Sequence, residues 1–353
     1  MTSTIKVDTI SENTSANGVA VDGVTLKDGA VGAAGTATSV AGVPLFTADS
    51  SIYIGQDVSG TDDTAQYNVA IGFTTLDAIT TGDSNVAIGY NAMTANTTGG
   101  SNISIGKSAL GTNTTGSTNI AIGLDALLNP DTESNNLGIG NAALGGSIAG
   151  GEYNVAIGNY SLDALTSGDY NTSIGYQSGT AVTTGSESVY VGFQAGANVT
   201  TGYKNVIIGS EAGLAGSPSG NLTTENHQLC LGNNTLTNAF IKVDWTVTSD
   251  KRDKADIEPL TMGLDFVNKL NPVSYRWDMR SDYENQTPDG THKKAKLSGG
   301  LLAQDVEILE REYGYKVEDE TSILTTVNSD GNYGLTYSKF VPILIKAVQE
   351  LSA

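Results

Sequence analysis

A five-residue pattern recurs through the middle of the chain and limits its possible folds more than any other feature. The pattern is Asn-aliphatic-small-aliphatic-Gly, as in NVAIG at 68, NIAIG at 119 and NVIIG at 205. Of the ten intervals between its successive occurrences, eight are 17 residues, one is 18 and one is 23. A fixed period of this length is typical of solenoids, in which each repeat packs only against its neighbours. The pattern begins at residues 51, 68, 85, 102, 119, 136, 154, 171, 188, 205 and 228.

Each repeat is expected to form one coil with two short strands and two turns. The aliphatic residues stand two apart, as Val69 and Ile71 do, which is the period of a β-strand. The residue between them is small, so we expect one aliphatic face and one nearly flat face that another surface can approach closely. The glycine that follows suits a turn with positive φ. A second apolar position, such as Leu76, and a TTG or TSG turn complete the unit in most repeats.

Stacked coils place equivalent residues above one another, about 4.8 Å apart. Asn68, Asn85 and Asn102 are therefore expected to form a ladder in which each amide bonds the next. Eleven coils would span roughly 50 Å, with a thin core of two or three aliphatic residues each. Because so thin a core buries little surface, we expect three chains to associate through their flat faces.

The sequence thus predicts a mainly β protein with a parallel β-solenoid or β-roll shaft. The repeats resemble the head repeats of trimeric autotransporter adhesins and the shafts of phage tail fibres. This resemblance implies a rigid, trimeric rod over residues 51–248. Residues 1–50 contain short alternating runs and a Gly/Ala-rich linker, and we expect an attachment or capping segment there.

The composition changes at Ser249, where charged residues become frequent. Helix spacing is predicted near 264–270, a strand in VSYRW, a strand or turn leading into a helix across 299–312, and a strand–turn–strand through Asp330-Gly331. A final helix, capped by Ser338 and with Pro342 in its first turn, carries an apolar stripe suited to a bundle with sister chains. The stripe consists of Phe340, Leu344, Ala347, Val348 and Leu351. Residues 249–353 are therefore predicted to form a smaller α+β domain with a terminal helix.

This region resembles the peptidase S74 family, the intramolecular chaperones of tail spikes and endosialidases. The matched positions are Ser249, Asp250, Arg252, Lys254, Ile257, Leu270, Pro272, Val273, Tyr275, Trp277, the run from Gly300 to Glu307, Leu335, Tyr337, Glu350 and Leu351.

The resemblance implies a single self-cleavage between Thr248 and Ser249, catalysed by a serine–lysine dyad. Ser249 would be the nucleophile and Lys254 its general base, because a serine hydroxyl attacks well only when a neighbour takes its proton. Lysine accepts a proton only in its neutral form, which nearby cations favour and carboxylates such as Asp250 oppose. Asp250 is counted among the site residues, and Gln304 is a candidate to stabilise the oxyanion. The alternative without catalysis is that Ser249 is an ordinary turn residue beside a solvated Lys254, in a domain that assembles the chains without cutting them.

Composition narrows the possible partners and cofactors. The net charge of −20 argues against binding to nucleic acid or to an anionic membrane. Cys230 is the only cysteine, so no intrachain disulfide is possible, and we expect it to be buried as a small apolar residue. His227 and His292 have no second ligand at metal spacing, so no metal site and no cofactor are expected. No signal peptide and no membrane-spanning run are evident.

The function expected from these features is a homotrimeric phage tail fibre, made in the host cytoplasm and located in the virion. Its N-terminus would attach to a tail or baseplate protein, and the fibre would contact a host surface receptor, for which a polysaccharide is one candidate. Two alternatives stay open: a cellular trimeric surface adhesin, and a tailspike that degrades polysaccharide. An adhesin would need a signal peptide and a membrane anchor, and a depolymerase would need paired carboxylates along a groove.

Overall fold

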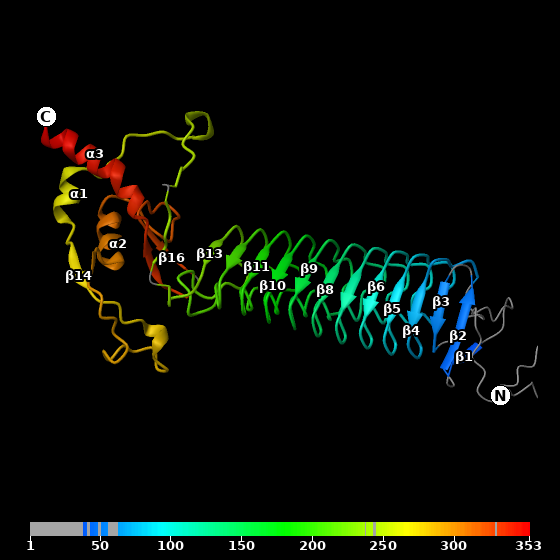
Figure 1. The fold of residues 1–353 in the computed structure, drawn as a ribbon. Coiled ribbons are helices and arrows are strands. Elements are labelled where there is room, and N and C mark those ends of the chain that lie inside the picture. Colours follow the sequence, from blue (N-terminus) through cyan, green and yellow to red (C-terminus); the bar gives the residue numbers. More distant parts are fainter. Residues whose placement is uncertain are drawn as a thin grey trace, which may run out of the picture.

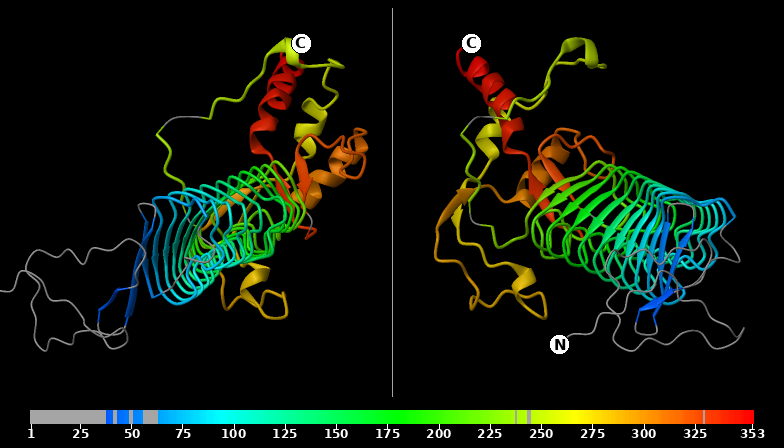
Figure 2. Two further views of the ribbon diagram at one scale, coloured as in Figure 1. Left: turned by 90° about the vertical axis from the view of Figure 1, so that its right-hand side faces the viewer. Right: turned by 45° about the vertical axis from the view of Figure 1, so that its right-hand side comes forward.

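The computed structural model describes residues 38–40, 43–48, 51–55, 63–236, 238–242, 245–328 and 330–353. These residues form a long β rod followed by a smaller region with three α-helices (Figure 1). Most of the expected attachment segment, residues 1–50, lies outside the described residues. The views in Figure 2 show that the coils keep a similar outline along the rod.

The rod is a parallel β-solenoid, as predicted. One 13-stranded sheet contains β1 (Thr38–Val40) to β13 in chain order. β2 (Val43–Ala48) pairs antiparallel with β1 and with β3 (Ser51–Ile54), and from β3 onward neighbouring strands are parallel, as in the pairing of Val69 with Val86. The remaining strands are β4 (Val69–Ile71), β5 (Val86–Ile88), β6 (Ile103–Ile105), β7 (Ile120–Ile122), β8 (Leu137–Ile139), β9 (Val155–Ile157), β10 (Thr172–Ile174), β11 (Val189–Val191), β12 (Val206–Ile208) and β13 (Leu229–Leu231).

From β4 onward, each described coil has one three-residue strand, so the expectation of two strands per coil is wrong. After the strand the backbone turns through left-handed residues, including Thr74 (φ 57°) and Leu76 (φ 52°). Such residues bend the chain instead of extending it, and their strain persists because the neighbouring coils hold them. The strand-ending glycine is required by close stacking: a Cβ on Gly72 would lie 2.5 Å from the carbonyl oxygen of Gly89 in the next coil.

The predicted faces of the strand are also reversed. The small central residue, such as Ala70 or Ala87, points inward and is fully buried. The aliphatic residues on either side point outward, and Ile71 and Ile105 keep 38% and 37% of their surface exposed. Two large side chains, Leu76 and Ile79, are already enclosed in this coil, so only a small residue fits on the strand opposite them. The flat surface expected to meet a sister chain is therefore the inner surface of the coil.

The asparagine ladder is present. The expected amide-to-amide bond occurs, for example, where Nδ2 of Asn154 donates to Oδ1 of Asn136 at 3.2 Å, and elsewhere the amides bond mainly to the backbone. The Oδ1 atom of Asn68 accepts the backbone N–H of Asn85 at 2.8 Å, and its Nδ2 donates to the carbonyl oxygen of Gly82 at 2.8 Å. Asn85 and Asn102 repeat this pattern one coil further on. Each amide thus joins the next coil's backbone to a turn of its own coil, and the side chains are fully buried.

The C-terminal elements largely match their predicted positions. They are η1 (Lys251–Asp253), α1 (Leu264–Lys269), β14 (Val273–Tyr275), η2 (Arg280–Asp282), β15 (Ser298–Gly300), α2 (Ala303–Glu312), β16 (Thr325–Val327), β17 (Tyr333–Leu335), η3 (Tyr337–Lys339) and α3 (Phe340–Leu351). Ser338 lies inside η3, and α3 begins after Lys339 without a side-chain cap, so the predicted Ser338 cap is wrong. Pro342 does lie in the first turn of α3, where no helical N–H bond is lost.

The helices α1, α2 and α3 share a core that is separate from the inside of the solenoid. Phe266 of α1 packs edge-on against Tyr313, with ring centroids 5.3 Å apart. The predicted apolar stripe of α3 divides between two faces: Phe340 and Ala347 are buried, whereas Leu344, Val348 and Leu351 are exposed. The buried members of this core are Met262, Phe266, Val306, Leu324, Phe340 and Ile343.

Candidate functional site

The junction between the solenoid and the helical region is a solvent-exposed segment. Residues 245–249 and 251–259 are all exposed, and in Figure 1 this yellow-green part of the chain runs apart from α2. Its one regular element is η1, a single 3₁₀ turn closed by the N–H of Lys254, which donates to the carbonyl of Lys251 at 3.3 Å. Thr248 and Ser249 lie immediately before this turn.

The turn brings the predicted nucleophile and base into contact. The Nζ atom of Lys254 donates to the Oγ atom of Ser249 at 2.6 Å and lies 3.4 Å from the backbone oxygen of Ser249. A nucleophile and its base need this separation for proton transfer. Both side chains come from one short segment, so the contact depends on local backbone geometry and not on packing between domains.

Asp250 has another partner. Its carboxylate accepts the backbone N–H of Arg252 at 2.9 Å and forms an ion pair with the Arg252 guanidinium, with Nη2 at 2.6 Å and Nε at 3.1 and 3.2 Å. The side-chain hydrogen bonds from Arg252 lower the pKa of Asp250, and the backbone bond adds to this effect. The same pair raises the pKa of Arg252. Asp250 therefore remains ionised and engaged within the turn.

Gln304, the predicted oxyanion residue, is an exposed residue in the first turn of α2. Among the described residues, the hydrogen bonds of Ser249 and Lys254 join these two residues to each other and do not include Gln304. The structure of the single chain thus brings the dyad together without this residue, and the role of Gln304 stays a prediction.

Several other residues of the sequence pattern meet in space and build the domain that follows the site. The backbone N–H of Leu301 donates to the Tyr337 hydroxyl at 2.9 Å, and a Cβ on Gly300 would lie 2.5 Å from that oxygen. The carboxylate of Glu350, near the chain end, accepts the N–H of Leu264 at 2.7 Å at the start of α1. A Cβ on Gly263 would lie 2.2 Å from the same carboxylate, so a larger residue there would displace the Glu350 side chain.

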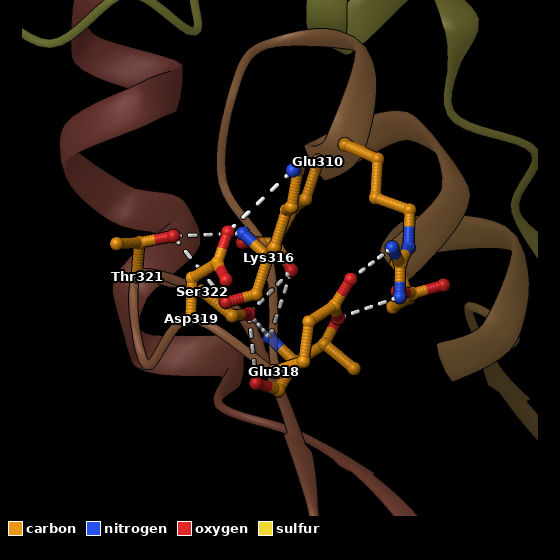
Figure 3. Close-up of polar contacts among 9 residues, drawn as sticks. Glu310, Lys316, Glu318, Asp319, Thr321 and Ser322 are labelled. Carbon is orange, nitrogen blue, oxygen red and sulfur yellow. Dashed lines mark hydrogen bonds and ion pairs between the residues drawn. The ribbon is translucent and has the colours of Figure 1, made fainter.

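Glu310 is a structural residue that the sequence reasoning missed. It is fully buried on α2, and its carboxylate accepts the Ser322 hydroxyl at 2.9 Å (Figure 3). The same carboxylate also accepts three backbone N–H groups. These N–H groups belong to Ile323, Leu324 and Thr325, at 2.8 to 3.0 Å. Glu310 follows the buried Val306 by four residues, so an acidic residue on the apolar stripe of α2 was the available signal. The carboxylate fixes the start of β16 against α2.

No candidate site for a metal is present in the described part of the chain. Among those residues, no group of three or more His, Cys, Asp or Glu is arranged to hold a metal ion. Of the helices described there, none combines the length and apolarity needed to cross a membrane. Cys230 is buried, as predicted.

The fold and the junction together define a class of protein: a β-solenoid shaft joined through a serine–lysine turn to a small α+β domain. Residues 249–315 match the family model of peptidase S74, described as chaperone of endosialidase. The chain therefore carries an S74 intramolecular chaperone domain behind its solenoid, and the match begins at Ser249 itself. Neither the curated proteins nor the solved structures provide a match to the chain.

Proposed function

We propose that the protein is a homotrimeric phage tail fibre whose C-terminal domain aligns three chains and then cuts itself off between Thr248 and Ser249. The N-terminus would attach to a tail or baseplate protein of the virion, and the shaft would present the fibre to a host surface receptor. The observation that carries the proposal is the outer face of the solenoid strands, which a single chain leaves partly exposed along the whole rod.

This outer face repeats with the period of the coil. In each strand from β4 to β13 the first and third residues face outward, as Val206 and Ile208 do at 36% and 40% exposure. Covering the exposed part of each such side chain contributes roughly 0.5–1 kcal/mol. This aliphatic face repeats at the same spacing over many coils, so the surface that matches it is the same face of another copy of the chain. Association through this aliphatic face supplies the burial that the narrow coil lacks.

The terminal helix offers a second surface for the same partners. Val341, Leu344, Ile345 and Val348 line an open hollow on the side of α3 that faces away from its own domain. Three such helices packed side by side would cover these residues in a bundle. The helix is tied to α1 through Glu350, so a bundle of α3 helices would also orient the three domains.

The need for such a domain follows from the repeats. A slip of one coil between two chains preserves nearly every contact, because neighbouring coils are alike. A non-repeating domain that associates first fixes the register before the coils pack. Removing that domain afterwards would leave the assembled shaft unable to equilibrate back to separate chains.

The cleavage chemistry uses the observed dyad. The Oγ atom of Ser249 attacks the carbonyl carbon of Thr248 while Nζ of a neutral Lys254 takes the hydroxyl proton. The C–N bond then breaks, the proton passes to the amine of Ser249, and an ester joins Thr248 to Ser249. Water hydrolyses the ester and leaves a carboxylate at Thr248 and a free serine hydroxyl. In one chain the dyad is exposed, and burial by sister chains would favour neutral lysine, which couples cutting to assembly.

Two measurements on the expressed full-length chain test the proposal. Intact mass should show fragments that end at Thr248 and begin at Ser249, and sedimentation should give the mass of three chains. Ser249→Ala and Lys254→Ala should remain full length yet sediment as trimers. Lys251→Ala is the matched control, because Lys251 is an exposed lysine of the same turn, and it should cleave normally. A monomer in solution would refute the trimeric fibre, and a full-length wild-type trimer would refute the cleavage alone.

A further inference from the structure

The turn that joins Ser249 to Lys254 has few means of holding itself together. It is one 3₁₀ turn of three residues, and none of its side chains is buried. An isolated turn this short is unstable in water because its few hydrogen bonds do not offset the cost of fixing the backbone. Its additional contacts come from Asp250, which caps the N-terminus by accepting from the backbone N–H of Arg252 and pairs with the guanidinium of the same residue.

The same pair changes the electrostatics around the lysine. Asp250 lies next to Ser249 in sequence, and a carboxylate there would be a natural ion partner for Lys254. Arg252 engages both carboxylate oxygens of Asp250, with Nε and Nη2 within 3.2 Å. The bonds of Lys254 among the described residues go to Ser249, so the lysine has not formed that ion pair.

Other charges surround Lys254 along the segment. Lys251 and Asp253 lie in the turn itself, and Asp256 follows it at φ 52°. All three are exposed, and among the described residues neither Asp253 nor Asp256 forms an ion pair with Lys254. Their effects are screened by solvent and are the same in every variant considered below. Asp250 is therefore the carboxylate whose release would most affect the lysine.

We propose that Asp250 and Arg252 form a positioning clamp for the self-cleavage dyad. The clamp holds the turn that places Lys254 on Ser249, and Arg252 keeps the Asp250 carboxylate away from the lysine ammonium. Neither residue touches the scissile carbonyl in this role, so both are positioning residues and not catalytic ones. The inference rests on the proposed self-cleavage and adds a function for Arg252, which that reaction does not otherwise use.

The clamp predicts different effects for its two members on the pH dependence of cutting. In Arg252→Gln the freed carboxylate can pair with Lys254 and favour its protonated form, so cleavage should become half-maximal at a higher pH and slow by up to about fivefold at pH 7. Asp250→Asn keeps a side chain that caps well and removes the charge, so its half-maximal pH should not rise. The double variant Asp250→Asn/Arg252→Gln should lose the upward shift. Arg252→Lys keeps the positive charge but lacks the planar guanidinium that donates to both carboxylate oxygens, so it should show a smaller upward shift than Arg252→Gln.

The experiment measures cleavage of the full-length chain after a short labelling pulse in cell-free translation, followed by a chase at pH values from 5 to 10. Circular dichroism and sedimentation of each variant carrying Ser249→Ala check that folding and assembly are unchanged. An unchanged half-maximal pH in Arg252→Gln, or an upward shift that persists in the double variant, would overturn the clamp. If the wild-type chain is never cut, the proposed self-cleavage fails instead, so the two failures are distinguishable.

Discussion

Inside one coil of the solenoid, Tyr190 is large and Gly196 is small, which is the reverse of the sizes found at these two positions in most earlier coils. In most earlier coils the buried strand residue is small and the residue six positions later is large, as with Ala156 and Leu162. In the coil of β11 the buried strand residue is Tyr190 and the later residue is Gly196. A Cβ on Gly196 would lie 2.4 Å from Cδ1 of Tyr190, so the two positions share one volume.

Reversing the exchange tests whether the inside of each coil is packed as a single closed volume. Tyr190→Ala alone removes a fully buried ring and should cost about 3–5 kcal/mol, the usual range for an aromatic side chain removed from a core. Gly196→Leu alone inserts atoms into the ring and should cost at least about 1–3 kcal/mol. The double variant recreates the arrangement of Ala156 and Leu162, and its cost should fall below about 1.5 kcal/mol.

The backbone permits this replacement. Gly196 has φ 61°, and Leu162 holds the equivalent position of its own coil at φ 49°. The nearest remaining neighbour in the double variant is Cδ1 of Ile207, 3.2 Å from the new Cβ, which a small rotation of that side chain relieves. The two single costs should therefore largely cancel, and the coupling energy should be at least about 2.5 kcal/mol.

Guanidinium unfolding of the full chain, followed by circular dichroism, gives the midpoint and slope of the solenoid transition for each variant. Tyr190→Phe is the control, because it keeps the ring and should shift the midpoint little. If the double variant is as unstable as the sum of its two single variants, the residues do not compete for one volume and the packing argument is wrong.

Three further predictions concern single positions. Asn102→Ala should lower the free energy of unfolding by about 2–4 kcal/mol, because the buried N–H of Asn119 loses its acceptor; a loss below about 0.5 kcal/mol would contradict the ladder. Glu310→Gln should destabilise the C-terminal domain by about 2–4 kcal/mol in thermal melts, since an amide cannot accept all four hydrogen bonds; an unchanged melting temperature would exclude this role. The Lys346 side chain, followed by the N–H that α1 donates, lowers the pKa of Glu350 from its ordinary value of 4.5, so this carboxylate stabilises the fold above that pH and its contribution is lost as pH falls. The stability difference between wild type and Glu350→Gln should therefore be present at pH 7 and shrink as the pH falls below 4.5, and a difference that stays constant on acidification would refute the assignment.

The sequence by itself determined the repeating part of the fold and predicted which serine and lysine meet at the junction. The 17-residue period fixes parallel coils in register, because a constant repeat returns each residue to the same place in the next coil. The spacing of Ser249 and Lys254 and the surrounding motif predicted the contact that the η1 turn makes. The elements of the C-terminal domain were also predictable, since their apolar spacing and turn residues are local signals.

Only the tertiary structure decided which side of the strand is the inside. Alternation separates Val69 and Ile71 from Ala70 but does not say which set is enclosed, and the volume available beside Leu76 settles it. The division of α3 into a buried face with Ile343 and an exposed face depends likewise on how α1 and α2 pack against it. The sequence shows how often apolar side chains recur along a strand or helix. Which of them are buried depends on the space left by residues that only the fold brings together.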